Sequence, residues 1–175
     1  MPVDAPDCPK GPPGPVLPDL LGPGLRLVIC GMAAGRVSAL RRAYYAGPGN
    51  RFWPMLAATG LADRLYRPEE FPALLPLGIG LTDIAKTASG PDRAIPHRLE
   101  DAAELRAKIE RHAPRILAFN GKSAAGRFLG ARAAYGWQAA TIGKTRLFVL
   151  PSTSGAARGF WDEAPWRALA EAARR

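Results

Sequence analysis

Four short apolar segments recur along the chain and alternate with longer segments of helical spacing. The first, residues 25–30, reads LRLVIC and is apolar apart from Arg26. A nearly continuous apolar run of this length is typical of a strand that is covered on both faces in a parallel sheet. Similar segments follow at 77–81, 115–119 and 145–150. The pattern therefore predicts a small, mostly parallel sheet of four to five strands.

The segments between these strands have the spacing of amphipathic helices. Residues 101–112 read DAAELRAKIERH, which places Leu105 and Ile109 four positions apart among charged residues. This is the pattern of a helix that lies on a sheet. Further helices are predicted at 50–60, 67–75, 122–129 and 166–175. The alternation of strands and helices predicts an α/β fold, a three-layer α/β/α sandwich.

The chain begins with a segment of different composition. Residues 1–24 are so rich in Pro and Gly that no regular element can persist there. We expect a flexible leader over 1–24, with 16–21 as the part able to pack, followed by a single domain over 25–175. A proline-rich docking ligand is the alternative interpretation of the leader.

Charge and composition narrow the class of protein. The chain has 24 Lys and Arg against 15 Asp and Glu, a net charge of +9, which favours a polyanionic partner such as nucleic acid. An arginine-rich composition also arises in proteins of high-GC genomes. No apolar run approaches the roughly 20 residues of a membrane span, and no signal-peptide pattern opens the chain, so we expect a cytoplasmic protein without membrane contact.

Cysteine and histidine usage argues against a metal or a cofactor. The two cysteines, Cys8 and Cys30, make a disulfide improbable and exclude a four-cysteine iron–sulfur cluster. His97 and His112 lack the spacing of a metal site. We therefore expect a protein that uses neither a metal ion nor a cofactor.

A glycine-rich turn, GMAAG at 31–35, follows the first predicted strand. Its small residues allow a ligand to approach backbone N–H groups closely. In open parallel sheets, ligands bind at the carboxyl ends of the strands. The turn matches neither GxGxxG nor a phosphate loop, so an ordinary turn between a strand and a loop remains an alternative.

Three further motifs give this turn a context. AYYAGPGNRFW occupies 43–53, GIGLTDIAK occupies 78–86 and LPSTSG occupies 150–155. Their order after a Gly-x-x-x-Gly turn resembles the mismatch-specific uracil-DNA glycosylases, bacterial relatives of thymine-DNA glycosylase. The resemblance runs from about residue 25 to the end of the chain. It implies a uracil-DNA glycosylase-like fold.

The resemblance also implies an activity. Such an enzyme flips uracil out of DNA into a pocket and hydrolyses its N-glycosidic bond. The product is an abasic site, and the pathway is base excision repair. Since the motifs contain no apparent lysine nucleophile, we expect a monofunctional enzyme, and we expect it to be a monomer.

The resemblance assigns a first group of site residues. The substrate-binding residues that it implies are Gly31, Met32, Ala33, Tyr45 and Asn50. Tyr45 holds the place of the aromatic residue that stacks on the base, and Tyr44 replaces it if the alignment slips by one residue. A tyrosine packed in the core is the alternative. Asn50 holds the place of an asparagine that fixes the pocket, although an Asn just before a helix also suits an N-cap.

The chain departs from the family at the catalytic position. The resembling enzymes have a water-positioning asparagine at the third position of the turn, where this chain has Ala33. Asp83 is the predicted replacement, because it lies just past a strand expected beside the first one. Its carboxylate could activate water or stabilise an oxocarbenium-like transition state. Capping of the loop or pairing with Lys86 is the alternative role for Asp83, and Asp92 is a second choice as the catalytic carboxylate.

The last motif is the predicted DNA-binding loop. In the resembling enzymes this loop enters the minor groove, contacts phosphate and fills the gap left by the flipped base. The residues that the resemblance implies are Ser152, Ser154, Gly155, Ala156, Ala157 and Arg158. Alanine at the wedge position, Ala156, is small, so Arg158 is expected to share its work. The expected partner is double-stranded DNA with uracil or a mismatch, and single-stranded DNA as well; an ordinary Ser/Gly loop is the alternative.

Two other classes of function compete with a glycosylase. A catalytically silent reader of damaged or single-stranded DNA is suggested by Ala33. A small-molecule α/β hydrolase or a nucleotide-binding protein is disfavoured, because the chain lacks a nucleophile elbow and a phosphate loop.

Overall fold

The computed structural model describes residues 14–175, apart from the side chains of Arg158 and Phe160. Its centre is a five-stranded sheet with the strand order β2-β1-β3-β5-β4. The first four strands in this order are parallel, and β4 at the edge is antiparallel to β5. The strands are β1 (Leu27–Gly31), β2 (Ile79–Asp83), β3 (Ile116–Asn120), β4 (Gly136–Ile142) and β5 (Thr145–Leu150). The predicted mostly parallel sheet is confirmed.

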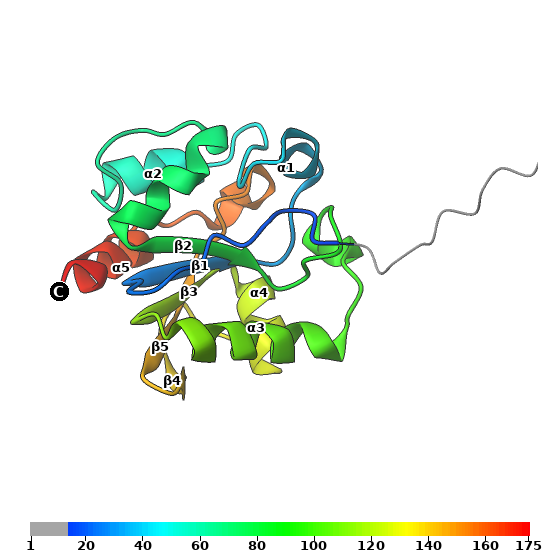
Figure 1. The fold of residues 1–175 in the computed structure, drawn as a ribbon. Helices are drawn as coiled ribbons and strands as arrows, with labels where there is room; N and C mark the ends of the chain where they lie inside the picture. The colour runs from blue at the N-terminus through cyan, green and yellow to red at the C-terminus, as the bar shows by residue number, and fades with distance from the viewer. Residues whose placement is uncertain (1–13) are drawn as a thin grey trace, which may run out of the picture.

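Helices cover both faces of the sheet (Figure 1). The α-helices are α1 (Arg36–Arg41), α2 (Phe52–Ala58), α3 (Leu99–His112), α4 (Lys122–Leu129) and α5 (Ala164–Arg174), and the 3-10 helices are η1 (Pro68–Leu77), η2 (Asp92–Ala94) and η3 (Gly155–Phe160). Side chains of α3 and α4 join the core on one face, and those of α2, α5 and η1 join it on the other. The predicted α/β/α sandwich is therefore confirmed. Within residues 14–175 no helix is long and apolar enough to cross a bilayer.

The side chains of a buried parallel strand alternate between the two layers. In β1, Leu27 and Ile29 pack against the layer of α2 and α5, whereas Val28 and Cys30 pack against the layer of α3 and α4. All four are fully buried. This is why the first segment reads as a continuous apolar run rather than as an alternating one.

Four elements escaped prediction, the strand β4, the helix α1 and the short 3-10 helices η2 and η3, and a fifth has a different geometry. The edge strand β4 reads GWQAATI and is largely exposed, so it has no apolar pattern. The helix expected at 67–75 is the 3-10 helix η1. It contains Pro72 and Pro76, which lack the N–H that an α-helix would use.

The predicted leader is partly ordered. Residues 14–24 run along the outer edge of β2, where Leu20 and Leu81 exchange two backbone hydrogen bonds of 2.9 Å. Leu17 is buried, with 1% of its surface exposed. The apolar side chains of this part complete the core beside β2, as was expected only for residues 16–21, so the flexible leader does not extend over residues 14–24. Residues 1–13 lie outside the described part of the chain.

Candidate active site

The carboxyl ends of the parallel strands bring four distant loops together. Gly31 at the end of β1 lies in register with Asp83 at the end of β2. The turn 31–35 pairs with the loop after β2 through an Ala34–Ser89 bridge. The segment that begins α2 is tied to the loop after β5, because the backbone N–H of Arg51 donates to the carbonyl of Thr153 over 2.9 Å. Glycosylase-like motifs far apart in sequence therefore share one edge of the sheet.

Asp83 lies at the centre of this edge. Only 5% of its surface is exposed. An added Cβ on Gly31 would lie 2.7 Å from Asp83 Oδ1 and 3.3 Å from the hydroxyl of Tyr45, so the carboxylate and the hydroxyl both sit against the turn. Within residues 14–175 no side chain or backbone N–H donates a hydrogen bond to the Asp83 carboxylate; the Thr82 hydroxyl reaches only the Asp83 backbone carbonyl, over 3.5 Å. The carboxylate therefore does not cap its loop.

The surroundings of Asp83 adjust its proton affinity. Burial raises the pKa of Asp83 to about 6, and the positive charge of Lys86 opposes this rise. Lys86 Nζ lies 3.8 Å from Asp83 Oδ2, which is a weak contact. A carboxylate that is ionised at pH 7 and has a pKa close to neutrality suits a general base.

Lys86 belongs to a buried charge network that reaches the ordered leader. Its Nζ lies 3.0 Å from Asp19 Oδ1 and donates to the hydroxyl of Tyr44 over 3.0 Å. Asp19 also contacts Lys108 at 2.8 Å and accepts a 2.6 Å hydrogen bond from Thr82. Burial tends to raise the pKa of Asp19, but the lysine charges and these hydrogen bonds outweigh it and lower the pKa. The network thus fixes an ionised carboxylate and an ammonium group behind Asp83.

The two adjacent tyrosines have different environments. Tyr44 is buried, and its hydroxyl donates to the carbonyl of Pro18 over 3.0 Å; it is the core tyrosine. The ring of Tyr45 stacks on Phe52 with a centroid separation of 3.9 Å and an interplanar angle of 23°. Phe52 thus covers one face of Tyr45. Stacking of Tyr45 on a base would have to use the other face, and it stays a prediction.

The hydroxyl of Tyr45 is an unusual polar group. It is buried and makes no hydrogen bond of good geometry within residues 14–175; the side chain of Asn120, which is engaged with Thr153, lies close enough to lower the pKa of Tyr45 slightly. Burial, followed by the charge of Asp83, raises the pKa of Tyr45 well above its ordinary value, so the hydroxyl stays protonated. A buried donor without a partner costs about 1–3 kcal/mol. A ligand that accepts this hydrogen bond beside Asp83 would recover that free energy.

The remaining predicted pocket residues have mixed roles. The side chain of Met32 is buried in the core of the α3 and α4 layer, so only its backbone can face a ligand, and Ala33 is half-buried beside it. Asn50 Oδ1 accepts a 3.0 Å hydrogen bond from the N–H of Phe52. Asn50 thus satisfies the N–H of the first residue of α2, but it lies one residue before the N-cap, which is Arg51.

The loop after β5 is held from behind by Asn120. The side-chain amide of Asn120 donates to Thr153 Oγ1 over 2.9 Å and accepts from the Thr153 N–H over 3.1 Å. Ser154 and Ala156 are exposed on this loop, and Ser152, Gly155 and Ala157 are half-buried. A Cβ on Gly155 would lie 3.1 Å from the carbonyl of Pro48, so the two motif loops touch. The side chain of Arg158 lies outside the described part of the structure.

Sequence reasoning missed three contributors to this edge. Asp19 lies among the apolar residues of 16–21, the part of the leader expected to be able to pack, but no sequence signal indicates that its carboxylate reaches Lys86. Asn120, which follows the third predicted strand, suits a turn before a helix on sequence grounds, with contact to a ligand or DNA as the alternative. Arg51 was not singled out; its guanidinium lies 4.9 Å from the Trp161 ring centroid, and its Nη1 is buried without a partner within residues 14–175. The second choice for the carboxylate, Asp92, is exposed at the start of η2.

The close approach at Gly31 yields a stability prediction. Gly31→Ala would place a methyl group 2.7 Å from Asp83 Oδ1, so the carboxylate must shift. Overpacking of this kind costs about 1–3 kcal/mol, and we expect that decrease in the free energy of unfolding, measured with urea at pH 7. The control is Gly35→Ala, where an added Cβ meets nothing within 4 Å and φ is −64°. Equal stabilities of the two variants would contradict the placement of Asp83.

Comparison with known proteins agrees with this geometry. A profile of the Uracil DNA glycosylase superfamily matches residues 18–170. A similar fold occurs in the solution NMR structure of a protein from Methanosarcina acetivorans, whose description as a uracil DNA glycosylase is provisional. The TM-score is 0.61 with 24% sequence identity, over 91% of this chain and 97% of the other. At this identity the second likeness establishes the fold.

Proposed function

The chain belongs to the uracil DNA glycosylase superfamily, which supports DNA glycosylase activity, and we propose that uracil is the base that it removes from DNA. In this proposal it is a monofunctional enzyme of base excision repair that flips uracil out of DNA and leaves an abasic site. The observation that carries the proposal is the buried carboxylate of Asp83. It lies beside the turn 31–35, next to the hydroxyl of Tyr45.

The proposed reaction is hydrolysis at the sugar carbon C1′. The bond from C1′ to the uracil nitrogen breaks, its electron pair leaves with the base, and positive charge develops on the sugar. Asp83 opposes this charge and accepts a proton from the water whose oxygen bonds to C1′. The hydroxyl of Tyr45 donates to an acceptor on the edge of the base, and the open face of its ring contacts the base.

The DNA is proposed to lie across the loops of the same edge. The exposed residues of 152–157 face it, and Asn120 holds their loop in place. Because Ala156 is small, it fills the gap of a flipped base poorly. We therefore propose activity on single strands as well as on uracil opposite guanine or adenine, by a monomer in the cytoplasm. Membership of the mismatch-specific branch stays a prediction.

A silent DNA reader is the second candidate, and the observation that favours it is Ala33. A methyl group cannot position water. The buried carboxylate of Asp83 argues against this candidate, because burial of an ionised group costs free energy and a reader of the base would not need it.

Release of free uracil tests the proposal directly. Purified protein is incubated at pH 7 with oligonucleotides that contain one uracil, either single-stranded or opposite guanine or adenine. We expect free uracil and an equal amount of alkali-labile abasic sites, without strand cleavage before alkali. Binding of the same oligonucleotides without uracil release would instead identify the silent reader. Release of a different base in parallel reactions would keep the glycosylase and overturn uracil as its base.

A further inference from the structure

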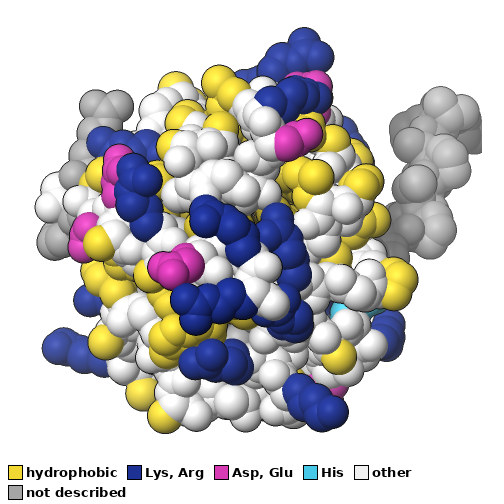
Figure 2. All heavy atoms as spheres, turned by 90° about the vertical axis from the view of Figure 1, so that its left-hand side faces the viewer, with side chains coloured by type: hydrophobic (Ala, Val, Ile, Leu, Met, Phe, Trp, Pro, Cys, Tyr) yellow, Lys and Arg dark blue, Asp and Glu magenta, His cyan; other side chains and the backbone are white. Residues whose placement is uncertain are grey.

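A basic groove lies at the opposite end of the sheet from the candidate active site. It has a volume of about 630 Å³ and runs between the outer side of α5 and the starts of β3 and β5. Figure 2 shows the face at this end, where Lys and Arg side chains gather near the centre. The groove residues that carry the argument are Arg115, Trp137, Lys144, Arg146, Glu171 and Arg175.

Most of the positive charge in the groove is not neutralised. Arg115, Lys144 and Arg146 are exposed, and within residues 14–175 none of them contacts a carboxylate. Arg175 pairs with Glu171 at 3.1 Å. Glu171 is the one acidic residue of the lining. Unpaired like charges in a concave surface attract a polyanion.

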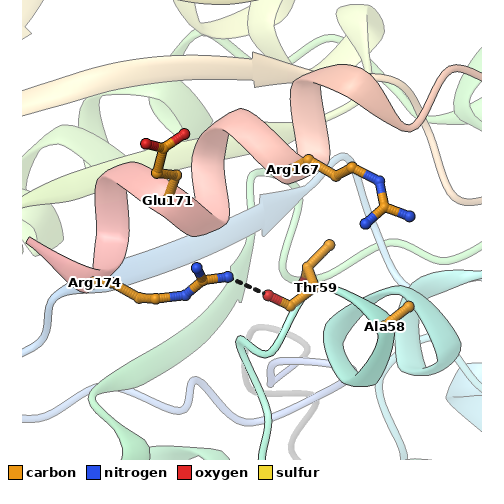
Figure 3. Close-up of a pocket in the computed structure, with 5 residues that line it drawn as sticks. All are labelled: Ala58, Thr59, Arg167, Glu171 and Arg174. Atoms are coloured by element: carbon orange, nitrogen blue, oxygen red, sulfur yellow. Dashed lines mark hydrogen bonds between the residues drawn. The ribbon is translucent and has the colours of Figure 1, made fainter.

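The arginines beside the groove extend this positive surface around the end of α5. Arg26 and Arg115 donate to the carbonyls of Ala173 and Ala172 over 3.3 and 3.5 Å. On the other side of α5, a smaller hollow of about 370 Å³ has Arg167, Arg174 and Glu171 on its wall (Figure 3); Arg167 is paired with Glu163 at 2.9 Å, whereas Arg174 donates to the carbonyl of Thr59. Burial and the charges of Arg174 and Arg115 lower the pKa of Arg26. The cluster therefore carries mutual repulsion that an anion would relieve.

The shape of the groove favours a chain of phosphates over a single anion. Its free cations come from three neighbouring backbone segments, the start of β3, the turn between β4 and β5, and β5 itself, where the N–H of Arg146 donates to the carbonyl of Arg115 over 3.1 Å; three adjacent cations can contact successive phosphates. Trp137 forms part of the wall; it is 39% exposed, and the Arg146 guanidinium lies 3.7 Å from its ring centroid. An indole stacked on arginine is a rigid apolar surface beside the cations.

We propose that this groove is a second, non-catalytic binding site for the backbone of a DNA strand. The choice of DNA as the polyanion rests on the proposed function. A five-residue strand is about 17 Å long, so DNA at the carboxyl edge leaves the groove free. The protein thus holds a second segment of DNA while the first is at the active site.

The test measures binding of an undamaged strand at the groove. A 20-nucleotide oligothymidylate without uracil is titrated into the protein while tryptophan fluorescence is recorded. The part of the fluorescence change that is lost in Trp137→Phe is the signal of the groove. Two double variants are compared. The groove variant combines Lys144→Glu and Arg146→Glu, and the control variant combines Arg106→Glu and Arg132→Glu, two exposed cations outside both sites. We expect the groove variant to bind the oligonucleotide about tenfold more weakly than the parent protein. The slope of log K against log salt concentration should decrease by about 1.4 in magnitude, which corresponds to two lost phosphate contacts. The control variant is expected to leave the Trp137 signal unchanged.

Two further measurements separate the possible outcomes. Lys144→Glu alone, in an exposed turn, is expected to weaken binding about threefold, and it serves if the groove variant fails to fold. Uracil release from a 9-nucleotide oligonucleotide is expected to stay unchanged in these variants. Failure of the proposed DNA-binding groove can therefore be distinguished from failure of the proposed glycosylase activity. The proposal would be overturned if the Trp137 signal were absent or if all variants bound the oligonucleotide with equal affinity. An acidic protein would then be the expected partner of the groove.

Discussion

Asp83→Asn is expected to lower the rate of uracil release at least about a hundredfold, within the roughly 10²–10⁴-fold that a positioned acid or base contributes. Asparagine keeps the size of the side chain but can neither accept the proton of water nor oppose a positive sugar with a full charge. The measurement is single-turnover release of uracil from a single-stranded oligonucleotide at pH 7. Equal rates in the two proteins would exclude Asp83 as the catalytic carboxylate.

The pH dependence of the rate provides the control for this assignment. Since the pKa of Asp83 is raised to about 6, the carboxylate is ionised at pH 7 and becomes protonated below pH 6. The rate of the parent protein is therefore expected to fall about tenfold per pH unit below 6. In Asp83→Asn the residual rate should not have this midpoint. A parent profile that is flat between pH 5 and 7 would show that ionisation of Asp83 is not required.

The same substitution is expected to stabilise the protein at pH 7. In the folded state the pKa of Asp83 is about 6, against 3.8 for an unperturbed aspartate. Between these values the folded state holds a proton that the unfolded state has lost, so stability falls as the pH rises through this window. A difference of this size corresponds to at most about 3 kcal/mol. A loss of activity together with an increased free energy of unfolding at pH 7 would distinguish a catalytic role from misfolding.

The sequence predicted the central features of the fold because burial controls them. Strands covered on both faces must be apolar throughout, and so β1, β2, β3 and β5 were found. The edge strand β4 escaped because its exposed face carries no apolar pattern, and its pairing with β5 is set by tertiary context. The register of Gly31 with Asp83 explains why a carboxylate after the second predicted strand could be expected near the glycine-rich turn.

The environment of Asp83 could not be predicted, because it depends on residues far apart in the chain. Asp19 reaches Lys86 only because the ordered part of the leader runs beside β2. High Pro and Gly content correctly excludes helices and strands, but it does not exclude packing of an irregular segment. The hydroxyl of Tyr45 is a similar case, since its lack of a partner depends on the backbone path between α1 and α2.

The second large effect is expected for Lys86→Met. Lys86 is 8% exposed and contacts Asp19 at 3.0 Å, Asp83 at 3.8 Å and the hydroxyl of Tyr44 at 3.0 Å. Removal of one partner from a buried ion pair costs about 3–5 kcal/mol when the other charge stays buried without compensation; Asp19 keeps Lys108 and Thr82 as partners, so the lower end, about 3 kcal/mol, applies here. We expect a decrease of this size in the free energy of unfolding, measured with urea at pH 7.

A purely structural role for Lys86 would end with that loss of stability, but its position behind Asp83 predicts more. Lys86 lowers the pKa of Asp83 against the effect of burial. Without it, the pKa of Asp83 rises further, so the midpoint of the rate profile should move to higher pH and the rate at pH 7 should fall. The rates are compared at equal concentrations of folded protein, at a temperature where the variant remains native.

Lys108→Met separates the two roles of Lys86, which are the ion pair with Asp19 and the effect on the pKa of Asp83. Lys108 contacts Asp19 at 2.8 Å, as Lys86 does, but it is 26% exposed and has no contact with Asp83. Because water screens a partly exposed pair, its removal should cost about 1 kcal/mol or less, and it should move the pH midpoint upward by less than Lys86→Met does, because the charge of Lys108 lowers the pKa of Asp83 less than that of Lys86. If both variants shifted the midpoint equally, the charge of Asp19 would be the controlling group. A midpoint unchanged in both would mean that burial alone sets the proton affinity of Asp83.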